Sequence, residues 1–188
     1  YSIAVVRLRL TAVAVCSVTF FLGWMGLQSA TPESLRGMLP LNPATPYIRF
    51  TPETPPIATA VLVHGLNSNK EFMQTLAMAL ADAGVETYAV DLPGHGDSSG
   101  SFNYANSLEA VEAILDSLES GTGGLIVMGH SMGGALLTDL APSEEFRTML
   151  LMSPAPIPLA DFSTERLLIV TGALEAPRIN QFIPPLIE

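Results

Sequence analysis

The sequence is poor in the residues from which covalent cross-links and metal sites are built. It contains one cysteine, Cys16, so no disulfide can form within the chain. Its three histidines all lie in loop motifs without metal-ligand spacing, and we expect neither a bound metal nor a cofactor. Basic residues are also scarce, with 8 Lys and Arg against 18 Asp and Glu and a net charge of −10. Because such a chain offers no basic patch, nucleic acid is not an expected partner.

Apolar residues, in contrast, are abundant. They make up 48% of the 188 residues, which is enough for one domain with an appendage. The appendage is predicted at residues 1–30, where Leu10–Leu27 carries no charge, has about the length that spans a bilayer, and follows Arg7 and Arg9. This pattern predicts a membrane anchor with the rest of the chain outside the cytoplasm. A cleaved signal peptide is the alternative, and the domain would then be secreted.

Residues 31–56 are rich in proline and threonine. Proline at this density prevents helix and resists central strands, so the segment is predicted to be mostly an extended linker. Within it only Tyr47–Phe50 has the character of a strand, a short one at the edge of a sheet. Residues 57–188 alternate apolar runs with helical patterns, which predicts an α/β domain with a mostly parallel sheet and helices on both faces.

Capping signals and apolar periodicity place the helices and strands of this domain. Ser68 and Glu71 form a capping-box pattern that predicts a helix ending at Gly84. The apolar face of this helix is predicted to hold Phe72, Leu76, Leu80 and Ala83. Asn106 is the predicted cap of a second helix, whose apolar stripe is Leu108, Val111, Ile114, Leu115 and Leu118. Strands are predicted at residues 85–90, 125–128, 148–152 and 167–171.

A Gly-x-Ser-x-Gly motif lies between the second of these strands and residues that favour helix. The pattern predicts strand, sharp turn and helix, with Ser131 at the turn. A serine there must adopt a strained backbone conformation, and its hydroxyl then points outwards. Gly129 and Gly133 are expected because a Cβ at either position would crowd the strand against the helix.

Two further motifs end apolar runs: Val61–Gly65 closes with His-Gly, and Asp91–Ser98 reads Asp-Leu-Pro-Gly-His-Gly-Asp-Ser. In this order and spacing, together with Gly-His-Ser-Met-Gly-Gly, they resemble the α/β-hydrolase family. Within the family the chain is most similar to the serine esterase, monoacylglycerol lipase and aminopeptidase-like branch, over about residues 47–178. The resemblance implies the α/β-hydrolase fold, here preceded by a single transmembrane or signal helix.

The resemblance also implies roles for individual residues. Ser131 would be the nucleophile, and the backbone N–H groups of Leu66 and Met132 would form the oxyanion hole. Glu175 lies where the family places the acid that orients the catalytic histidine, and Asp161 is the second candidate.

No histidine follows Glu175, although the family's order along the chain is serine, acid and histidine. His64, His95 and His130 each belong to one of the three loop motifs. We therefore interpret the sequence as a fragment whose catalytic histidine lies beyond it, and expect the fragment itself to have little activity.

The function predicted from these residues is cleavage of carboxylic esters, of lipids or of small acyl groups, through an acyl-enzyme on Ser131. Two alternatives stay open: an acyltransferase or peptidase that uses the same serine, and a non-catalytic hydrolase-fold module that binds a partner at the membrane. The connection between the last two predicted strands is short and rich in proline, which predicts a site with little or no lid.

Overall fold

The structure is a computed structural model, and it describes residues 32–118, 125–144, 146–155 and 164–170. These residues belong to one compact unit, Pro32–Glu188. The predicted anchor or signal segment lies outside the described residues. Within the described ranges, no helix has the length and apolar character needed to cross a bilayer.

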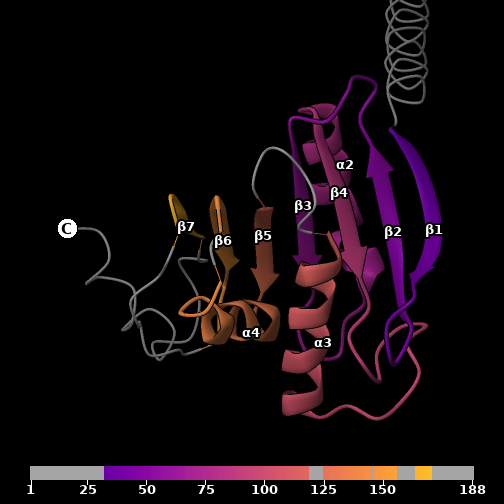
Figure 1. The fold of residues 1–188 in the computed structure, drawn as a ribbon, viewed down its shortest axis with the longest axis vertical. Coiled ribbons are helices and arrows are strands. Elements are labelled where there is room, and N and C mark those ends of the chain that lie inside the picture. The colour runs from indigo at the N-terminus through magenta and orange to yellow at the C-terminus, as the bar shows by residue number, and fades with distance from the viewer. Residues whose placement is uncertain (1–31, 119–124, 145, 156–163, 171–188) are drawn as a thin grey trace, which may run out of the picture. The chain divides into compact units, whose positions relative to one another are not determined.

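A seven-stranded sheet forms the centre of the molecule (Figure 1). Its strands lie in the spatial order β1-β2-β4-β3-β5-β6-β7, with the first two antiparallel and the last five parallel to one another. Their bounds are β1 Glu33–Leu39, β2 Thr45–Thr51, β3 Ala58–Val63, β4 Val85–Val90, β5 Leu125–His130, β6 Thr148–Met152 and β7 Leu167–Val170. The parallel strands predicted from apolar runs are confirmed, and β5 extends two residues further than predicted.

Helices cover both faces of this sheet. The short 3₁₀ helix η1 (Lys70–Met73) leads into α2 (Gln74–Asp82), and their buried side chains pack on one face. The other face carries α3 (Tyr104–Leu118) and α4 (Met132–Leu140), which lie side by side with α3 nearer β3 and α4 nearer β5 (Figure 1). Strand β3 serves both layers, because Ala60 and Leu62 face α2 while Val61 and Val63 face α3 and α4. The predicted architecture, a mostly parallel sheet between two helical layers, is therefore confirmed.

The proline-rich segment forms an antiparallel hairpin, so the prediction of an extended linker is wrong for residues 33–51. Here β1 pairs with β2 along seven residues, and β2 in turn pairs with β4. Strand β2 is therefore flanked on both sides, and the predicted edge strand at Tyr47–Phe50 is not at an edge. Three of its prolines lie outside the strands, because Pro40 and Pro43 are in the connection and Pro52 follows the end of β2. Pro46 is the second residue of β2, opposite Met38, and its carbonyl accepts the N–H of Asp91 at 2.9 Å.

The first predicted helix begins differently from its capping-box pattern. Its N-cap is Asn69 without a side-chain cap bond, and the first turn is 3₁₀ rather than α. The cause is a competing set of partners: the N–H of Lys70 donates to the carboxylate of Asp91, and the Glu71 side chain accepts from Arg36. The buried face consists of Met73, Ala77 and Ala81, whereas Phe72 and Ala83, predicted to be on that face, are exposed.

The second predicted helix also begins earlier than expected. It starts at Tyr104, and the side chain of Asn103, rather than that of Asn106, accepts the N–H of Ala105 at 2.9 Å. Its apolar stripe is confirmed, with Val111, Ile114 and Leu115 fully buried and the two end leucines partly buried.

Candidate active site

The turn between β5 and α4 holds Ser131 in a conformation that L-residues rarely adopt. Its backbone angles are φ 51° and ψ −113°. Hydrogen bonds fix it there, because the N–H donates to the carbonyl of Met152 at 3.0 Å and the carbonyl accepts from Ala135 and Ala155. Such a conformation persists only where the surrounding structure enforces it. The strained serine turn predicted from the sequence is thus confirmed as a structural feature.

Close backbone approaches explain the two glycines of the motif. A Cβ on Gly129 would lie 2.5 Å from the carbonyl carbon of Gly133, inside the first turn of α4. A Cβ on Gly133 would meet the carbonyl oxygen of Val63 and would lie 2.7 Å from that of His64. Backbone atoms cannot move aside as a flexible side chain can. The start of α4 therefore packs directly on the end of β5, which requires Gly129, and on the end of β3, which requires Gly133.

The loop after β3, residues 64–70, lies beside this turn because β3 and β5 are adjacent parallel strands. Val63 pairs with Gly129, and a Cβ on Gly65 would lie 3.1 Å from the Cβ of Ser131. Leu66 is the next residue, with a half-exposed side chain. Met132 is buried and opens α4, where the first N–H groups of a helix have no partner within it. Gly65, which precedes Leu66, thus lies against Ser131, and Met132 directly follows the serine. The oxyanion role of Leu66 and Met132 stays a prediction.

His64 is fully buried, and both of its ring nitrogens are occupied. Nε2 accepts the N–H of Leu92 at 3.1 Å, which assigns the proton to Nδ1, and Nδ1 then donates to the carbonyl of Gly65 at 2.8 Å. Burial lowers the pKa of His64, and the neighbouring Lys70 cation and His95 lower it further, although the Gly65 carbonyl and Asp91 act in the opposite direction. His64 is therefore a neutral structural side chain.

The rings of the other two histidines, His130 and His95, also contact neighbouring residues. The ring of His130 packs against that of Phe72 with centroids 4.9 Å apart, and its Nδ1 is buried without a hydrogen-bond partner. The ring of His95 lies edge-on to Phe102, and its Nδ1 is 3.1 Å from the carbonyl of Pro93. In the part of the chain that the structure describes, no histidine hydrogen-bonds to the serine hydroxyl. Glu175 and Asp161, the candidate acids, lie outside the described residues.

A buried cation beside this region was not predicted. The ammonium group of Lys70, 2% exposed, lies 2.6 Å from Oδ2 of the fully buried Asp91 and 2.7 Å from Oδ2 of Asp97. Burial lowers the pKa of Lys70, but hydrogen bonds and charge from the two aspartates outweigh it and raise the pKa overall. The sequence offers one signal of this cluster, because its single lysine lies shortly after the His-Gly motif and two aspartates lie in the motif Asp91–Ser98.

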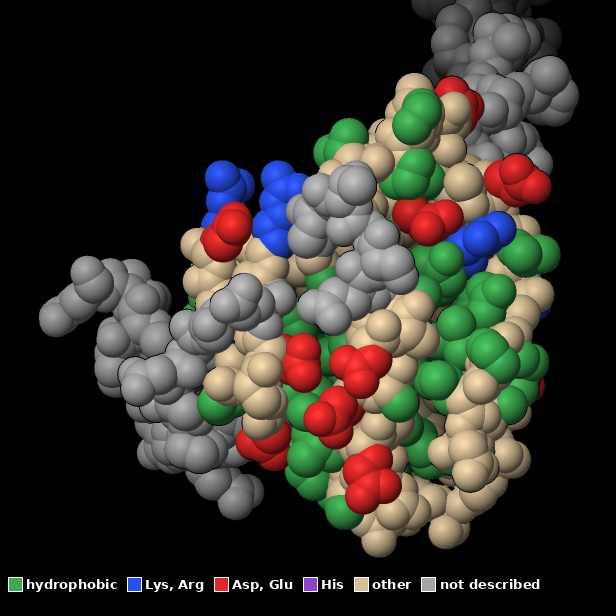
Figure 2. All heavy atoms as spheres, in the orientation of Figure 1, with side chains coloured by type: hydrophobic (Ala, Val, Ile, Leu, Met, Phe, Trp, Pro, Cys, Tyr) green, Lys and Arg blue, Asp and Glu red, His purple; other side chains and the backbone are tan. Residues whose placement is uncertain are grey.

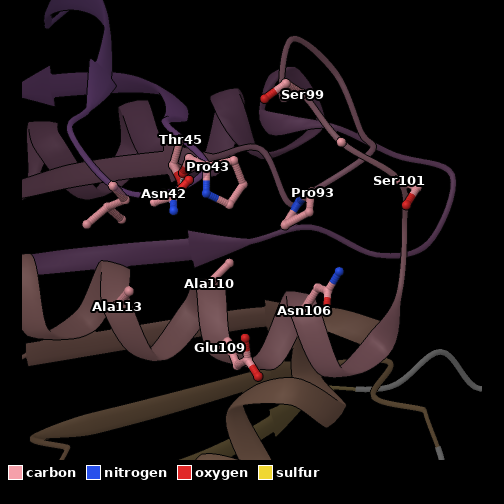
Figure 3. A pocket seen from close by; sticks show the side chains of 12 residues that line it. Asn42, Pro43, Thr45, Pro93, Ser99, Ser101, Asn106, Glu109, Ala110 and Ala113 are labelled. Carbon is pink, nitrogen blue, oxygen red and sulfur yellow. Dashed lines mark hydrogen bonds between the residues drawn. The ribbon is translucent and has the colours of Figure 1, made fainter.

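A cavity of about 500 Å³ lies beside the loop that joins β4 to α3. It is bounded by the β1–β2 connection, by Pro93 and residues 99–101, and by one side of α3 (Figure 3). Asn42, Asn106 and Glu109 contribute polar groups to its wall. Neither Ser131 nor Leu66 lines it, so this cavity is separate from the serine turn.

Comparison with known proteins gives a consistent family assignment. A family model described as "Alpha/beta hydrolase family" matches residues 60–187. The chain is 32% identical over 117 residues to a monoacylglycerol lipase of Mycolicibacterium smegmatis, a match that covers 58% of this chain and 42% of the lipase. It is 33% identical over 111 residues to a probable alcohol acetyltransferase of Saccharomyces cerevisiae, covering 56% of this chain and 32% of that protein. The matched region thus spans less than half the length of these relatives.

Solved structures agree on the fold. A serine hydrolase without a lid from Xanthomonas campestris superposes with a TM-score of 0.63 at 22% identity, covering 79% of this chain and 77% of that one. A soluble variant of the monoglyceride lipase from Saccharomyces cerevisiae gives a TM-score of 0.57 at 20% identity, covering 68% of this chain and 46% of the lipase chain. At these identities the likeness concerns the fold alone.

Proposed function

The chain belongs to the alpha/beta hydrolase family, and on that basis we propose that it is a serine hydrolase that cleaves carboxylic esters of lipids or small acyl groups. The observation that carries the proposal is the strained Ser131 at the head of α4, beside loop 64–70. Ser131 is half-buried, and this arrangement places its hydroxyl at a helix N-terminus, where backbone N–H groups favour developing negative charge.

In the proposed reaction the hydroxyl oxygen of Ser131 attacks the ester carbonyl while a general base takes its proton. The N–H groups of Leu66 and Met132 donate to the resulting oxyanion. Collapse of the tetrahedral intermediate breaks the bond to the alcohol, which leaves with the proton, and forms the acyl-enzyme. Water then repeats the sequence and releases the acid.

The base that this scheme needs is a histidine, and the three in the chain are engaged by other neighbours. On the contacts that the structure shows, none of these three histidines is assigned as the base. Glu175 is the proposed acid that orients the base, with Asp161 as the second candidate. Both assignments rest on the position of these residues along the chain.

Side chains around the serine support an uncharged, apolar substrate. Leu66, in the loop beside the serine turn, and Phe72 are 52% and 58% exposed. Phe72 packs on His130, the residue before Ser131, so one of these side chains borders the serine turn directly. Acidic side chains gather over α3 on the face shown in Figure 2, where Glu109, Glu112 and Asp116 are exposed. With a net charge of −10, an anionic substrate would meet repulsion.

As part of the same proposal, the hydrolase domain lies outside the cytoplasm, either held by a membrane anchor or released by secretion. This location rests on the uncharged Leu10–Leu27 segment and the two arginines before it. Fractionation of cells that express the whole protein tests it. Carbonate-resistant membrane association supports an anchor, release into the medium supports a cleaved signal, and recovery in the cytosol contradicts both.

Acyl transfer to an alcohol is a second candidate, favoured by the likeness to the probable alcohol acetyltransferase. The two reactions share the acyl-enzyme and differ in the acceptor. Measuring free acid and alkyl ester formed from one activated ester in the presence of a primary alcohol separates them. Mostly acid supports hydrolysis, and mostly ester supports transfer.

The main test is the whole protein against p-nitrophenyl esters of two to twelve carbons, with the Ser131→Ala variant as control. We expect turnover by the wild type and loss of at least about a thousandfold in the variant, as is usual for a nucleophile. A fluorophosphonate probe should label the peptide that contains Ser131. An inactive, unlabelled wild type would favour the non-catalytic binding module instead.

A further inference from the structure

We propose that the buried ion pair between Lys70 and Asp91 is a positioning device, which together with His64 fixes both ends of loop 64–70 and so holds the N–H of Leu66 towards Ser131. The inference rests on the proposed function, since it concerns the geometry of the oxyanion hole. Its structural part, that the pair orders the loop, can be tested without any activity.

The first end of the loop is held by His64. Its ring accepts the N–H of Leu92 at 3.1 Å through Nε2, and its Nδ1 bonds the Gly65 carbonyl at 2.8 Å. The His64 side chain thus links, by hydrogen bonds, the backbone just before Leu66 to the backbone just after β4. Because the ring is fully buried, water cannot substitute for either bond.

The second end is held by Lys70 through two separate bonds to one carboxylate. Its N–H donates to Oδ1 of Asp91 at 2.8 Å, and its ammonium group lies 2.6 Å from Oδ2. The same Oδ2 also accepts the N–H of Asp97 at 2.9 Å. Asp91 directly precedes Leu92, so two consecutive residues after β4 anchor both ends of the loop.

Between these anchors the loop has little packing of its own. His64, Gly65 and Lys70 are buried, whereas Leu66 and Asn67 are exposed and the next two residues are half-buried. Asn67 has a φ of 57°, which marks a tight bend in the middle. The conformation of such a short segment is determined by how its two ends are held. The direction of the Leu66 N–H therefore depends on both His64 and Lys70.

The charge on Lys70 restricts the positions that its side chain and the carboxylate of Asp91 can adopt. Buried ion pairs add little to stability, because removing two charges from water costs about as much as their attraction returns. They do constrain geometry, since every lone pair and proton must be satisfied. Lys70 has two aspartates within 2.7 Å and Glu71 at 3.5 Å, and both oxygens of Asp91 are used.

The test uses the whole protein and the double variant Lys70→Met, Asp91→Asn, which removes both charges and avoids stranding one in the core. The matched control is Arg36→Met, which breaks the exposed 2.6 Å pair with Glu71 on the same η1 helix but leaves the buried pair intact. Two quantities are measured: hydrogen–deuterium exchange of the amides of residues 65–69, and kcat and KM for a p-nitrophenyl ester.

In the double variant we expect exchange at residues 65–69 to accelerate at least about tenfold while the peptide containing Ser131 is unchanged. We expect kcat to fall about 100-fold, the usual effect of a misplaced group, with KM within about threefold of the wild type. The control should match the wild type in both measurements. If the double variant is poorly expressed, the single variant Asp91→Asn, which leaves Lys70 with Asp97 as a partner, should also show faster exchange at residues 65–69.

Unchanged exchange in either variant overturns the positioning role, whatever the activity. Unchanged kcat with faster exchange overturns the link to the oxyanion hole. An inactive wild type with faster exchange in the variant would instead refute the proposed function and leave the anchoring intact, so the two failures are distinguishable.

Discussion

The strain at Ser131 can be measured by replacing the serine with glycine. Glycine adopts positive φ without a steric penalty, and the strain on a non-glycine residue in such a region amounts to about 1–3 kcal/mol. Glycine also makes the unfolded chain more flexible, which costs about 0.4–1 kcal/mol. The Ser131 side chain makes no capping bond at the helix start, so its removal costs nothing further there. We expect Ser131→Gly to raise the free energy of unfolding by about 1 kcal/mol.

The reference for this measurement is Ser131→Ala, which keeps the Cβ and therefore the strain, and lacks the hydroxyl just as glycine does. For a chain of this size, 1 kcal/mol corresponds to a shift of about 2–4 °C in Tm. Thermal unfolding of the two variants, followed by circular dichroism, gives the difference directly. A glycine variant with a Tm equal to or below that of the alanine variant would refute the argument that the backbone is strained at this turn.

Two further predictions follow from contacts around the same turn. Gly133→Ala should destabilise the protein by about 3 kcal/mol or more, because the new Cβ meets the backbone carbonyl of Val63. Gly134→Ala, with nothing closer than 3.1 Å, should cost far less, and equal Tm values for the two would contradict the close approach. His64 has a pKa lowered by burial, so the unfolded state binds its proton more readily, and stability should fall as the pH drops below about 6.5. Replacing it with asparagine should flatten this dependence by up to about 1.4 kcal/mol per pH unit in urea titrations, and an identical slope would contradict a buried neutral ring.

The parts of the fold that follow from short-range rules could be predicted from the sequence. Apolar runs located the parallel strands, and the Gly-x-Ser-x-Gly spacing located the turn with its positive φ. Gly129 was expected for the reason the structure shows, because a Cβ there would meet Gly133 and Gly134 of the same motif. Gly133 is crowded instead by the carbonyls of Val63 and His64, which the motif alone does not reveal.

The errors arose where a distant residue competes for a local group. Ser68 and Glu71 match a capping box, but the N–H that begins the helix is taken by Asp91, twenty-one residues away in sequence. Proline density likewise suggested a linker, since nothing local reveals that β4 would pair with residues 47–50. The Lys70 cluster was missed for the same reason, because no spacing rule joins a lysine to a carboxylate in another loop.

Strand β7 affects how a shortened version of the protein would associate in solution. Among the described strands it pairs only with β6, and Leu168 and Val170 are 55% and 49% exposed. A version of the chain cut after residue 170 would therefore present an open strand edge with apolar side chains on it. Such an edge is a template for pairing with another copy. We expect that shortened version to self-associate through β7, with a lysine at position 168 as the simplest remedy.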